Sequence, residues 1–293
     1  MTEQQLKKFI ASIDTKHFVH GSNYKAKLQD TKLTSSQKIK LIDFGDKYKS
    51  YFEKNRELNA SKDSFEKVIR KRVELLNQYY NYLDCNSVND VFSSQGKFRS
   101  TILEEFMYIL LEGVIENYRK KIKDKSLLQM GSARAYTNLY FSGASFLDFI
   151  KAPQIGVNQK DQDFAIYRPM TISIGKSNAI ETNLPVVAVE NKTYIDKTML
   201  EGAIATAEKI KSGNPYALFL IVTENYDVDL NIDPIYSRID QIYVLRKSKR
   251  IKNQKLQPID CNVVVALVNQ IKGHLERDWS NVEKKMKETG QIL

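Results

Sequence analysis

An apolar run that ends in a charged triplet constrains this chain more than any other feature. Residues 186–189 read Val-Val-Ala-Val, which predicts a buried strand, and Glu190, Asn191 and Lys192 follow at once. Side chains alternate along a strand, so Glu190 and Lys192 point to one face and Asn191 points to the other. Apolar residues then recur at helical spacing, at Leu200, Ala203, Ile204 and Ala207. The stretch therefore predicts a buried strand with polar groups at its end, followed by a helix.

A further acid upstream completes a candidate metal site. Asp163 lies beside another strand-like run. Mg²⁺ prefers oxygen ligands, and Asp163, Glu190 and the Asn191 backbone carbonyl would supply them. The ion would lower the pKa of a water molecule and stabilise charge on a phosphate, and Lys192 would orient that water or accept its proton. A Glu-x-Lys at a strand end is more often a salt bridge across one face, so the pattern alone leaves a structural role open.

The other apolar patterns predict the rest of an α/β core. Residues 216–223 form a continuous apolar run and predict a central strand, while 239–245 alternate as a further strand. Helical patterns cover 98–121 and 263–279. Glu105 falls at the edge of the apolar stripe of the first helix, where an acid is usually a boundary residue, and Glu104 points more to solvent.

The N-terminal third reads as polar and mostly helical. Amphipathic segments are expected near 6–10, 35–52 and 63–83, and many Lys and Arg residues decorate them. Those cations indicate a solvated helix face or, alternatively, an arm that grips phosphates. Residues 86–97 are rich in Asn, Ser and Gly and indicate a boundary. We therefore expect a helical region at 1–94, with DNA contact as one role, and a second domain at 95–293.

Two further stretches are candidates for DNA contact. Residues 126–150 show no helical or strict strand period, so they read as an irregular segment in which Arg134 and Asn138 are suited to guanine and adenine edges. The basic run 246–252 follows the expected strand at 239–245 and indicates a solvated turn or a contact with the DNA backbone. Its candidate phosphate-binding residues are Arg246, Lys247, Lys249 and Arg250.

Long stretches around these residues resemble the subunits of the BbvCI-type restriction endonucleases. The similar stretches, in chain order, are 100–111, 139–153, 160–164, 187–224 and 238–250. The resemblance implies a PD-(D/E)XK nuclease fold, and it assigns the metal-binding acid to Asp163 and the Glu-x-Lys pair to Glu190 and Lys192. It also assigns the acid of the preceding helix to Glu105. Gln162 stands where the pattern has a proline that the superfamily often lacks.

The resemblance also implies the fold class and the reaction. The expected architecture is α/β, a PD-(D/E)XK restriction-endonuclease-like core with a mixed central sheet flanked by helices and a helical N-terminal region. The expected function is that of a type II restriction endonuclease subunit of a restriction-modification system. It would hydrolyse double-stranded DNA at a short specific site with Mg²⁺, paired with a second subunit as a homodimer or with a related chain. The alternatives are a repair or junction nuclease on the same core, and a DNA-binding partner that does not cut.

Composition agrees with this expectation and excludes several classes. The formal charge of +10 suits a polyanionic partner, or reflects a Lys-rich composition. The two cysteines, Cys85 and Cys261, are far apart and indicate neither zinc nor disulfides, as expected of a cytoplasmic protein. The sequence has no phosphate-binding GxxxxGK[ST] loop, no GxSxG motif and no apolar run long enough to span a membrane.

Overall fold

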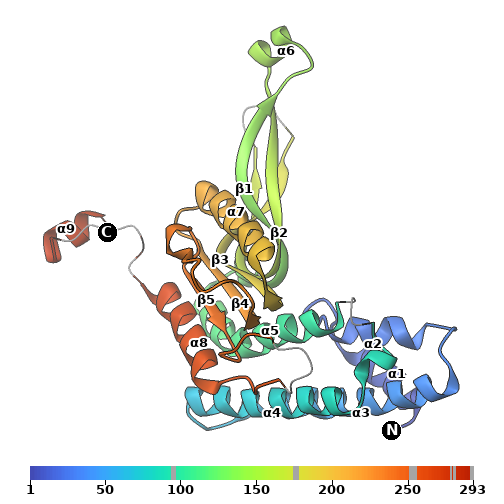
Figure 1. Ribbon diagram of the computed structural model, residues 1–293. Helices are drawn as coiled ribbons and strands as arrows, with labels where there is room; N and C mark the ends of the chain where they lie inside the picture. The colour runs from blue at the N-terminus through green and yellow to red at the C-terminus, as the bar shows by residue number, and fades with distance from the viewer. Residues whose placement is uncertain (94–96, 174–177, 251–255, 278, 280–281, 291–293) are drawn as a thin grey trace.

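In the described part of the chain, five strands form one mixed sheet at the centre of the molecule (Figure 1). The computed structural model describes the chain except residues 94–96, 174–177, 251–255, 278, 280–281 and 291–293. The strands, which neighbour one another in chain order, are β1 (Gln129–Ser142), β2 (Gln154–Ile172), β3 (Ile180–Ile195), β4 (Leu218–Tyr226) and β5 (Gln241–Val244).

The pairing of the strands makes the sheet mixed. β2 runs antiparallel to both β1 and β3, whereas β3, β4 and β5 run parallel to one another. The two continuous apolar runs occupy the centre, and Val187, Val189 and Leu220 are fully buried there. Strands that are covered on both faces need apolar residues at successive positions, which explains why these runs do not alternate. The expected mixed sheet and its two buried strands are confirmed.

Helices cover both faces of the sheet. α7 (Lys197–Gly213) lies on one face, where its buried residues pack on Ala188, Phe219 and Ile221. The helix bears the predicted periodicity, since Leu200, Ala203 and Ala207 are all buried. α5 (Phe98–Arg119) and α8 (Cys261–Glu276) pack on the other face. α8 ends at Glu276, short of the expected position 279.

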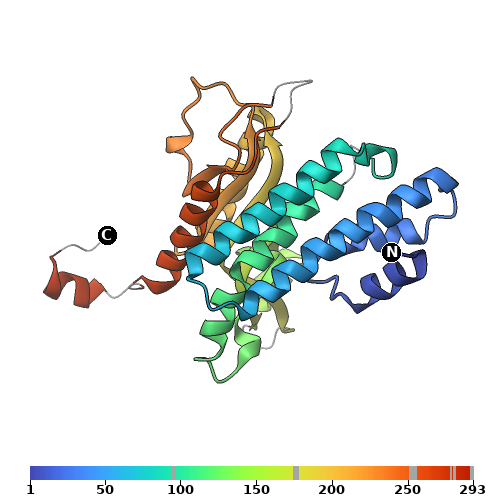
Figure 2. The same cartoon turned by 90° about the horizontal axis from the view of Figure 1, so that it is seen from below.

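The N-terminal helices form a base beneath the sheet. They are α1 (Glu3–Ser12), α2 (Gly21–Leu28), α3 (Ser35–Glu57) and α4 (Phe65–Cys85). Thr2 and Thr34 begin α1 and α3 with capping boxes, in which each hydroxyl accepts the backbone N–H of a Gln three residues on. Seen from below, α3 and α4 run side by side beneath α5 (Figure 2). Their buried residues join those of α5, the sheet and α8 in one hydrophobic cluster, and the predicted division at residue 94 stays a prediction.

The segment 126–150 is not the irregular loop that its sequence indicates. β1 continues to Ser142, and the short helix α6 (Phe146–Lys151) links it to β2. We call residues 138–158 the arm, because they project from the sheet away from the base (Figure 1). Alternation is lost in β1 because two register shifts interrupt its pairing and its outer residues are exposed on both faces. The alternation of apolar and polar residues, by which a strand is recognised in a sequence, is therefore absent from the arm.

The remaining elements are short. They are the helix α9 (Val282–Glu288) and the 3₁₀ turns η1 (Leu58–Ala60), η2 (Val88–Asp90), η3 (Lys125–Leu127) and η4 (Pro234–Tyr236). Cys85 and Cys261 are free thiols, so no disulfide joins them. Within the described residues, no helix combines the length and the apolar character that crossing a bilayer requires.

Candidate active site

The predicted site residues Asp163, Glu190 and Lys192 lie together where β2 and β3 run side by side. The antiparallel register pairs Phe164 with Val189 and brings Asp163 beside Asn191. The charged triplet lies within β3 and not at its end, where the sequence predicted it, because the strand continues to Ile195. Lys192 Nζ lies 3.3 Å from Asp163 Oδ2 and 3.4 Å from Glu190 Oε2, so one ammonium group holds both carboxylates. Asp163 Oδ2 also accepts the backbone N–H of Asn191 at 2.8 Å. The strand pairing thus produces a compact cluster of two acids and one base.

Burial and charge act in opposite directions on Lys192. Burial lowers the pKa of its ammonium group, but the neighbouring Asp163 and Glu190 carboxylates outweigh that effect and leave the pKa raised. The protonated form is therefore stabilised in this arrangement.

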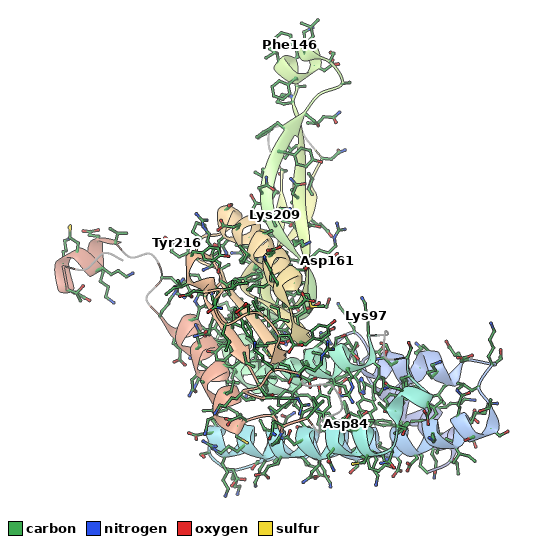
Figure 3. All side chains as sticks on the ribbon, viewed as in Figure 1. Asp84, Lys97, Phe146, Asp161, Lys209 and Tyr216 are labelled. Carbon is green, nitrogen blue, oxygen red and sulfur yellow. The ribbon has the colours of Figure 1, made fainter. Side chains whose placement is uncertain are left out.

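A polar cavity of about 640 Å³ opens on Asp163 and Lys192, and Glu190 lies behind Lys192, outside the cavity lining. The cavity lies between the N-terminal ends of α5 and α7, and Asp196 fixes the start of α7 by accepting the Met199 N–H at 2.8 Å. Figure 3 labels Asp161 at the foot of the arm and Lys97 at the start of α5, and both residues line the cavity. The lining includes Lys97, Ser100, Glu104, Arg134, Asp161, Asp163, Asn191, Lys192, Tyr194 and Met199.

Two other cavities have comparable volumes but not this chemistry. One, of about 750 Å³, lies between the α3–α4 connection and the C-terminal half of α5. The other, of about 950 Å³, lies against β1, β2 and β3 and shares Arg134 with the candidate site. Neither borders Asp163 or Lys192, so we assign the candidate site from its residues and not from its volume.

The structure corrects the sequence-based choice of Glu105. Its carboxylate is buried in the base, where it accepts the Tyr48 hydroxyl at 2.9 Å and the His20 N–H at 3.1 Å. The preceding residue, Glu104, lines the cavity instead. Successive residues of a helix point about 100° apart, so Glu104 and Glu105 cannot face the same site.

Both glutamates titrate unusually, for different reasons. Burial, and after it the nearby Asp163 carboxylate, raise the pKa of Glu104 to about 7. Burial raises the pKa of Glu105 to about 8, against the lowering effect of its hydrogen bonds from Tyr48, His20 and Gly21. Glu105 therefore belongs to a buried polar network that joins α5 to the N-terminal helices.

That network gives folding a defined pH dependence. The Glu105 pKa rises from 4.5 to about 8 on folding, so the stability it contributes is present below 4.5 and is lost as the pH rises through 8. Burial lowers the His20 pKa from 6.5 to about 3, which has the opposite effect below 6.5. Between pH 6.5 and 8 the Glu105 contribution remains, with a slope of up to about 1.4 kcal/mol per pH unit.

We expect Glu105→Gln to remove the part of the slope that Glu105 contributes, while Glu104, whose pKa is also raised to about 7, keeps its own smaller part. In the wild type, ionisation of Glu105 lowers the unfolding free energy by roughly 1.5 kcal/mol between pH 6.5 and 8. Glutamine mimics the protonated carboxyl group and does not ionise, so this decrease should be absent from the variant. Urea unfolding at several pH values measures it. Glu116→Gln, on an exposed part of α5, serves as the control and should keep the wild-type slope. An unchanged slope in Glu105→Gln would show that Glu105 is already ionised at pH 6.5.

Arg134 and Asn138 are exposed on β1. Arg134 borders the candidate cavity, and its Nε lies 3.7 Å from Asp161 Oδ1 in an exposed ion pair. Asn138 lies further along β1, at the start of the arm, beside Asn158 and Lys160. The structure thus brings Arg134 to the site and leaves Asn138 at a distance along the strand.

The basic run after β5 divides into buried and exposed cations. Arg246 is buried, contrary to the expectation of a DNA contact, because its backbone continues to pair with Glu224 and turns its side chain inward. Its Nε donates to Glu224 Oε2 at 2.8 Å, and the Tyr80 hydroxyl donates to Glu224 Oε1 at 2.9 Å. Lys247 pairs with Asp260 at 2.7 Å.

Lys247, Lys249 and Arg250 are the exposed cations among the described residues of the run. Lys249 faces solvent, and Arg250 stacks 3.8 Å above the ring of Tyr194, which lines the cavity. Arg250 also lies 3.4 Å from Asp227. Lys252, the last cation of the run, lies outside the described residues. Lys247, Lys249 and Arg250 therefore keep exposed positions suited to phosphate contact, whereas Arg246 does not.

Sequence reasoning missed Glu104, Lys97 and Ser100, which α5 brings to the cavity. The sequence contained a signal for the two glutamates but not for Lys97 and Ser100. Glu105 lies between Ile102 and Ile109 on the helical wheel, which predicts burial, and Glu104 lies outside that stripe. Lys97 and Ser100 precede and begin a helix that packs on β3, but that packing is a tertiary contact without a sequence signature.

The observed sheet and cluster define a class of protein. A mixed sheet flanked by helices, with two carboxylates and a lysine at adjoining strands, is the arrangement expected of a restriction-endonuclease-like α/β fold. The family model described as Bpu10I restriction endonuclease matches residues 95–260. The chain therefore belongs to the Bpu10I restriction endonuclease family, and the expected fold class and kinship are confirmed.

A solved structure supports the fold over almost the entire chain. The structure described as the native BbvCI A2B2 tetramer at low resolution matches with a TM-score of 0.66 and 18% sequence identity. The match covers 90% of this chain and 99% of the solved one, so it extends well beyond the residues that the family model matches. No curated protein sequence matches the chain.

Proposed function

We propose that the chain is a subunit of a type II restriction endonuclease that hydrolyses phosphodiester bonds of double-stranded DNA with Mg²⁺. The observation that carries the proposal is the cluster in which Lys192 Nζ lies within 3.4 Å of both the Asp163 and the Glu190 carboxylates. A family member without this cluster would have no charged groups arranged for hydrolysis. The family and the fold place the chain among restriction enzymes, and the cluster supports an active subunit.

The donor atoms of the site fit a hard divalent cation. Asp163 and Glu190 would hold it, together with the backbone carbonyl of Asn191. Both hydrogen bonds to Asp163 use Oδ2, and no hydrogen bond among the described residues occupies Oδ1. The part of the chain that the structure describes contains no group of three or more His, Cys, Asp or Glu side chains suited to a metal. Oxygen atoms of the backbone or of DNA would therefore complete the ligand set. When bound, the cation supplies positive charge for the phosphate as its charge rises during hydrolysis.

The protein side chains then have separate roles. Lys192 orients the attacking water and adds positive charge beside the scissile phosphate. The Asn191 N–H holds the Asp163 carboxylate in place through its 2.8 Å hydrogen bond. Glu104 is the acid that α5 supplies, in place of Glu105, and its carboxyl group borders the same cavity.

DNA would approach the corner between the arm and the base. Lys97 at the start of α5 and Arg134 on β1 border the cavity in that corner, and Lys249 and Arg250 are exposed beyond Tyr194. Cations at these positions would bind phosphates and position the duplex without reading its sequence. The N-terminal region 1–94 would extend the contact along the base, and Asn138 would contact DNA only if the duplex follows β1 toward the arm.

One chain contains one such cluster among its described residues, and one site hydrolyses one strand. We therefore propose that two subunits act together. The solved relative is described as an A2B2 tetramer, and we propose the same composition here, with two copies of this chain and two of a related chain. A repair or junction nuclease remains the second candidate, because it would use the same cluster. A discrete fragment pattern on a viral genome separates the two, since only a restriction enzyme cuts at one recurring sequence.

The decisive assay is cleavage of supercoiled plasmid with Mg²⁺ or Ca²⁺, by the chain alone and with its related subunit. We expect cleavage with Mg²⁺, whereas Ca²⁺ should support DNA binding without cleavage because it coordinates loosely and activates water poorly. Glu104→Gln should reduce cleavage by roughly 100-fold. Glu105→Gln is its matched control, because Glu105 is the neighbouring acid on α5 and points away from the cavity. Absence of any Mg²⁺-dependent cut, alone or with the related subunit, would assign the chain to the DNA-binding partners that do not cut.

A further inference from the structure

The end of the arm carries exposed apolar side chains that the proposed active site does not use. We call residues 140–151 the tip. Its large exposed apolar residues are Tyr140, Phe141, Phe146, Leu147, Phe149 and Ile150. Phe146 is labelled at the far end of the arm in Figure 3, well away from Asp161 and Lys97 at the candidate site. Contiguous apolar surface of this kind usually marks a binding surface.

The tip is a built structure rather than a loose turn. Ser145 begins α6, and its hydroxyl accepts the Asp148 N–H at 3.1 Å and donates to Asp148 Oδ2 at 2.6 Å. A side chain at Gly143 would lie 2.7 Å from the Phe149 backbone nitrogen, and one at Gly156 would collide with the Tyr140 ring. These two glycines let the aromatic residues pack closely on the arm itself. The apolar surface is therefore already ordered, which reduces the entropy lost on binding.

The exposed area is sufficient for a contact between two tips. The aromatic side chains at 140, 141, 146 and 149 are 47%, 51%, 76% and 43% exposed. At about 150–250 Å² for a whole aromatic side chain, they expose roughly 300–550 Å² before Leu147 and Ile150 are added. Two such surfaces would remove at most about 1,000 Å² from water, because Tyr140 and Phe141 point to opposite faces of β1. That area is near the minimum for a biological interface and fits a weak dimer.

Charge favours a second copy of the chain over DNA. The arm contains one acid, Asp148, and one base, Lys151, so it has no net charge and no cluster of cations for phosphates. Both residues lie on α6. In a two-fold contact the same surface meets itself, so Asp148 of each copy can lie opposite Lys151 of the other. The tip is thus complementary to itself in charge as well as in apolar character.

We propose that the tip joins two copies of this chain about a two-fold axis, with α6 of each copy against the tip of the other. This proposal depends on the proposed function in one respect, namely that one assembly contains two copies of this chain. It lies away from the cavity and needs neither metal nor DNA. An assembly of this kind would hold the two candidate sites apart, at the far ends of two arms.

The first test measures self-association of the full-length chain without metal or DNA. Light scattering and sedimentation should show a dimer for the wild type in the micromolar range. Phe146→Glu combined with Ile150→Glu should raise the dissociation constant by at least roughly 30-fold. Ile235→Glu is the matched control, because Ile235 is as exposed but lies on η4, outside the tip. A monomeric wild type, or a tip variant that still dimerises, would overturn the proposal.

The second test uses charge and does not depend on the apolar residues. Asp148→Lys alone and Lys151→Asp alone each place like charges opposite one another in both halves of the contact. Each should associate with itself several-fold more weakly than the wild type, and a mixture of the two should form a dimer of wild-type strength. A mixture no tighter than the single variants would show that the tip does not meet a second copy of itself.

Other occupants of the tip give different results. If the Phe146→Glu/Ile150→Glu variant dimerises normally but loses the related subunit, the tip binds that subunit and the proposal fails. If association is unchanged and only DNA affinity falls, the tip contacts DNA and the proposal also fails. Asp163→Ala should associate as the wild type does, so loss of cleavage and loss of association are separate measurements.

Discussion

Replacing Lys192 with alanine is expected to lower the rate of DNA cleavage by roughly three orders of magnitude and to change DNA affinity by only a few-fold. Lys192 Nζ is the cation that contacts both Asp163 and Glu190, so its loss removes the group that orients water at the proposed metal. Affinity is spread over many phosphate contacts, and one of them contributes little. Plasmid cleavage and gel-shift affinity on the same preparation measure both effects.

Lys197→Ala is the matched control for this experiment. Lys197 lies at the start of α7, close in sequence to Lys192, but its side chain is exposed and pairs only with Glu201 at 4.0 Å. The control removes the same charge and should leave cleavage within a few-fold of the wild type. Cleavage by Lys192→Ala at the wild-type rate would take Lys192 out of the catalytic set and leave the cluster as a structural ion pair.

Arg246→Ala is expected to destabilise the protein by about 3–5 kcal/mol. Its removal leaves the Glu224 carboxylate buried without its cation, because both side chains are at most 3% exposed in the ion pair. Chemical unfolding measures the loss. DNA affinity of the variant, measured at a temperature where it is folded, should equal that of the wild type, because Arg246 faces the core rather than the DNA.

Two companion variants separate charge from burial. Lys249→Ala removes an exposed cation of the same run and should change the unfolding free energy by less than about 0.5 kcal/mol. Glu224→Gln combined with Arg246→Met keeps an acceptor for Tyr80 and removes both charges, so it should be far more stable than Arg246→Ala alone. If Arg246→Ala weakens DNA binding and leaves the unfolding free energy unchanged, Arg246 faces the DNA. The assignment of Arg246 and Glu224 as a buried ion pair would then be wrong.

Local patterns were sufficient to predict the central strands and the cluster of charges. The run at 186–189 and the helical spacing after it need only burial and period to be recognised, and both are properties of adjacent residues. Alternation along β3 predicted that Glu190 and Lys192 share a face, and both contact one another in the structure. Asp163, which the sequence marked as an acid beside a strand-like run, joins them through the register of β2 against β3, and no local pattern predicts that register.

Side-chain direction was harder to predict wherever a neighbouring element decides it. Glu104 and Glu105 differ by one helical position, and the packing of α5 between the sheet and the N-terminal helices determines which of them reaches the cavity. Arg246 belongs to a run that reads as a solvated or DNA-binding turn. Its burial follows from continued backbone pairing with Glu224, on a strand distant in sequence.

The sequence by itself determined the α/β core, the chemical types at the site and the N-terminal helices, because hydrophobic period, capping residues and strand alternation act over a few neighbouring positions. Only the tertiary structure decided that 138–158 form a projecting arm and that Glu104, rather than Glu105, borders the cavity. It also decided that Arg246 is buried. Each of these depends on contacts between elements far apart in the chain, and such contacts leave no period in the residues that make them.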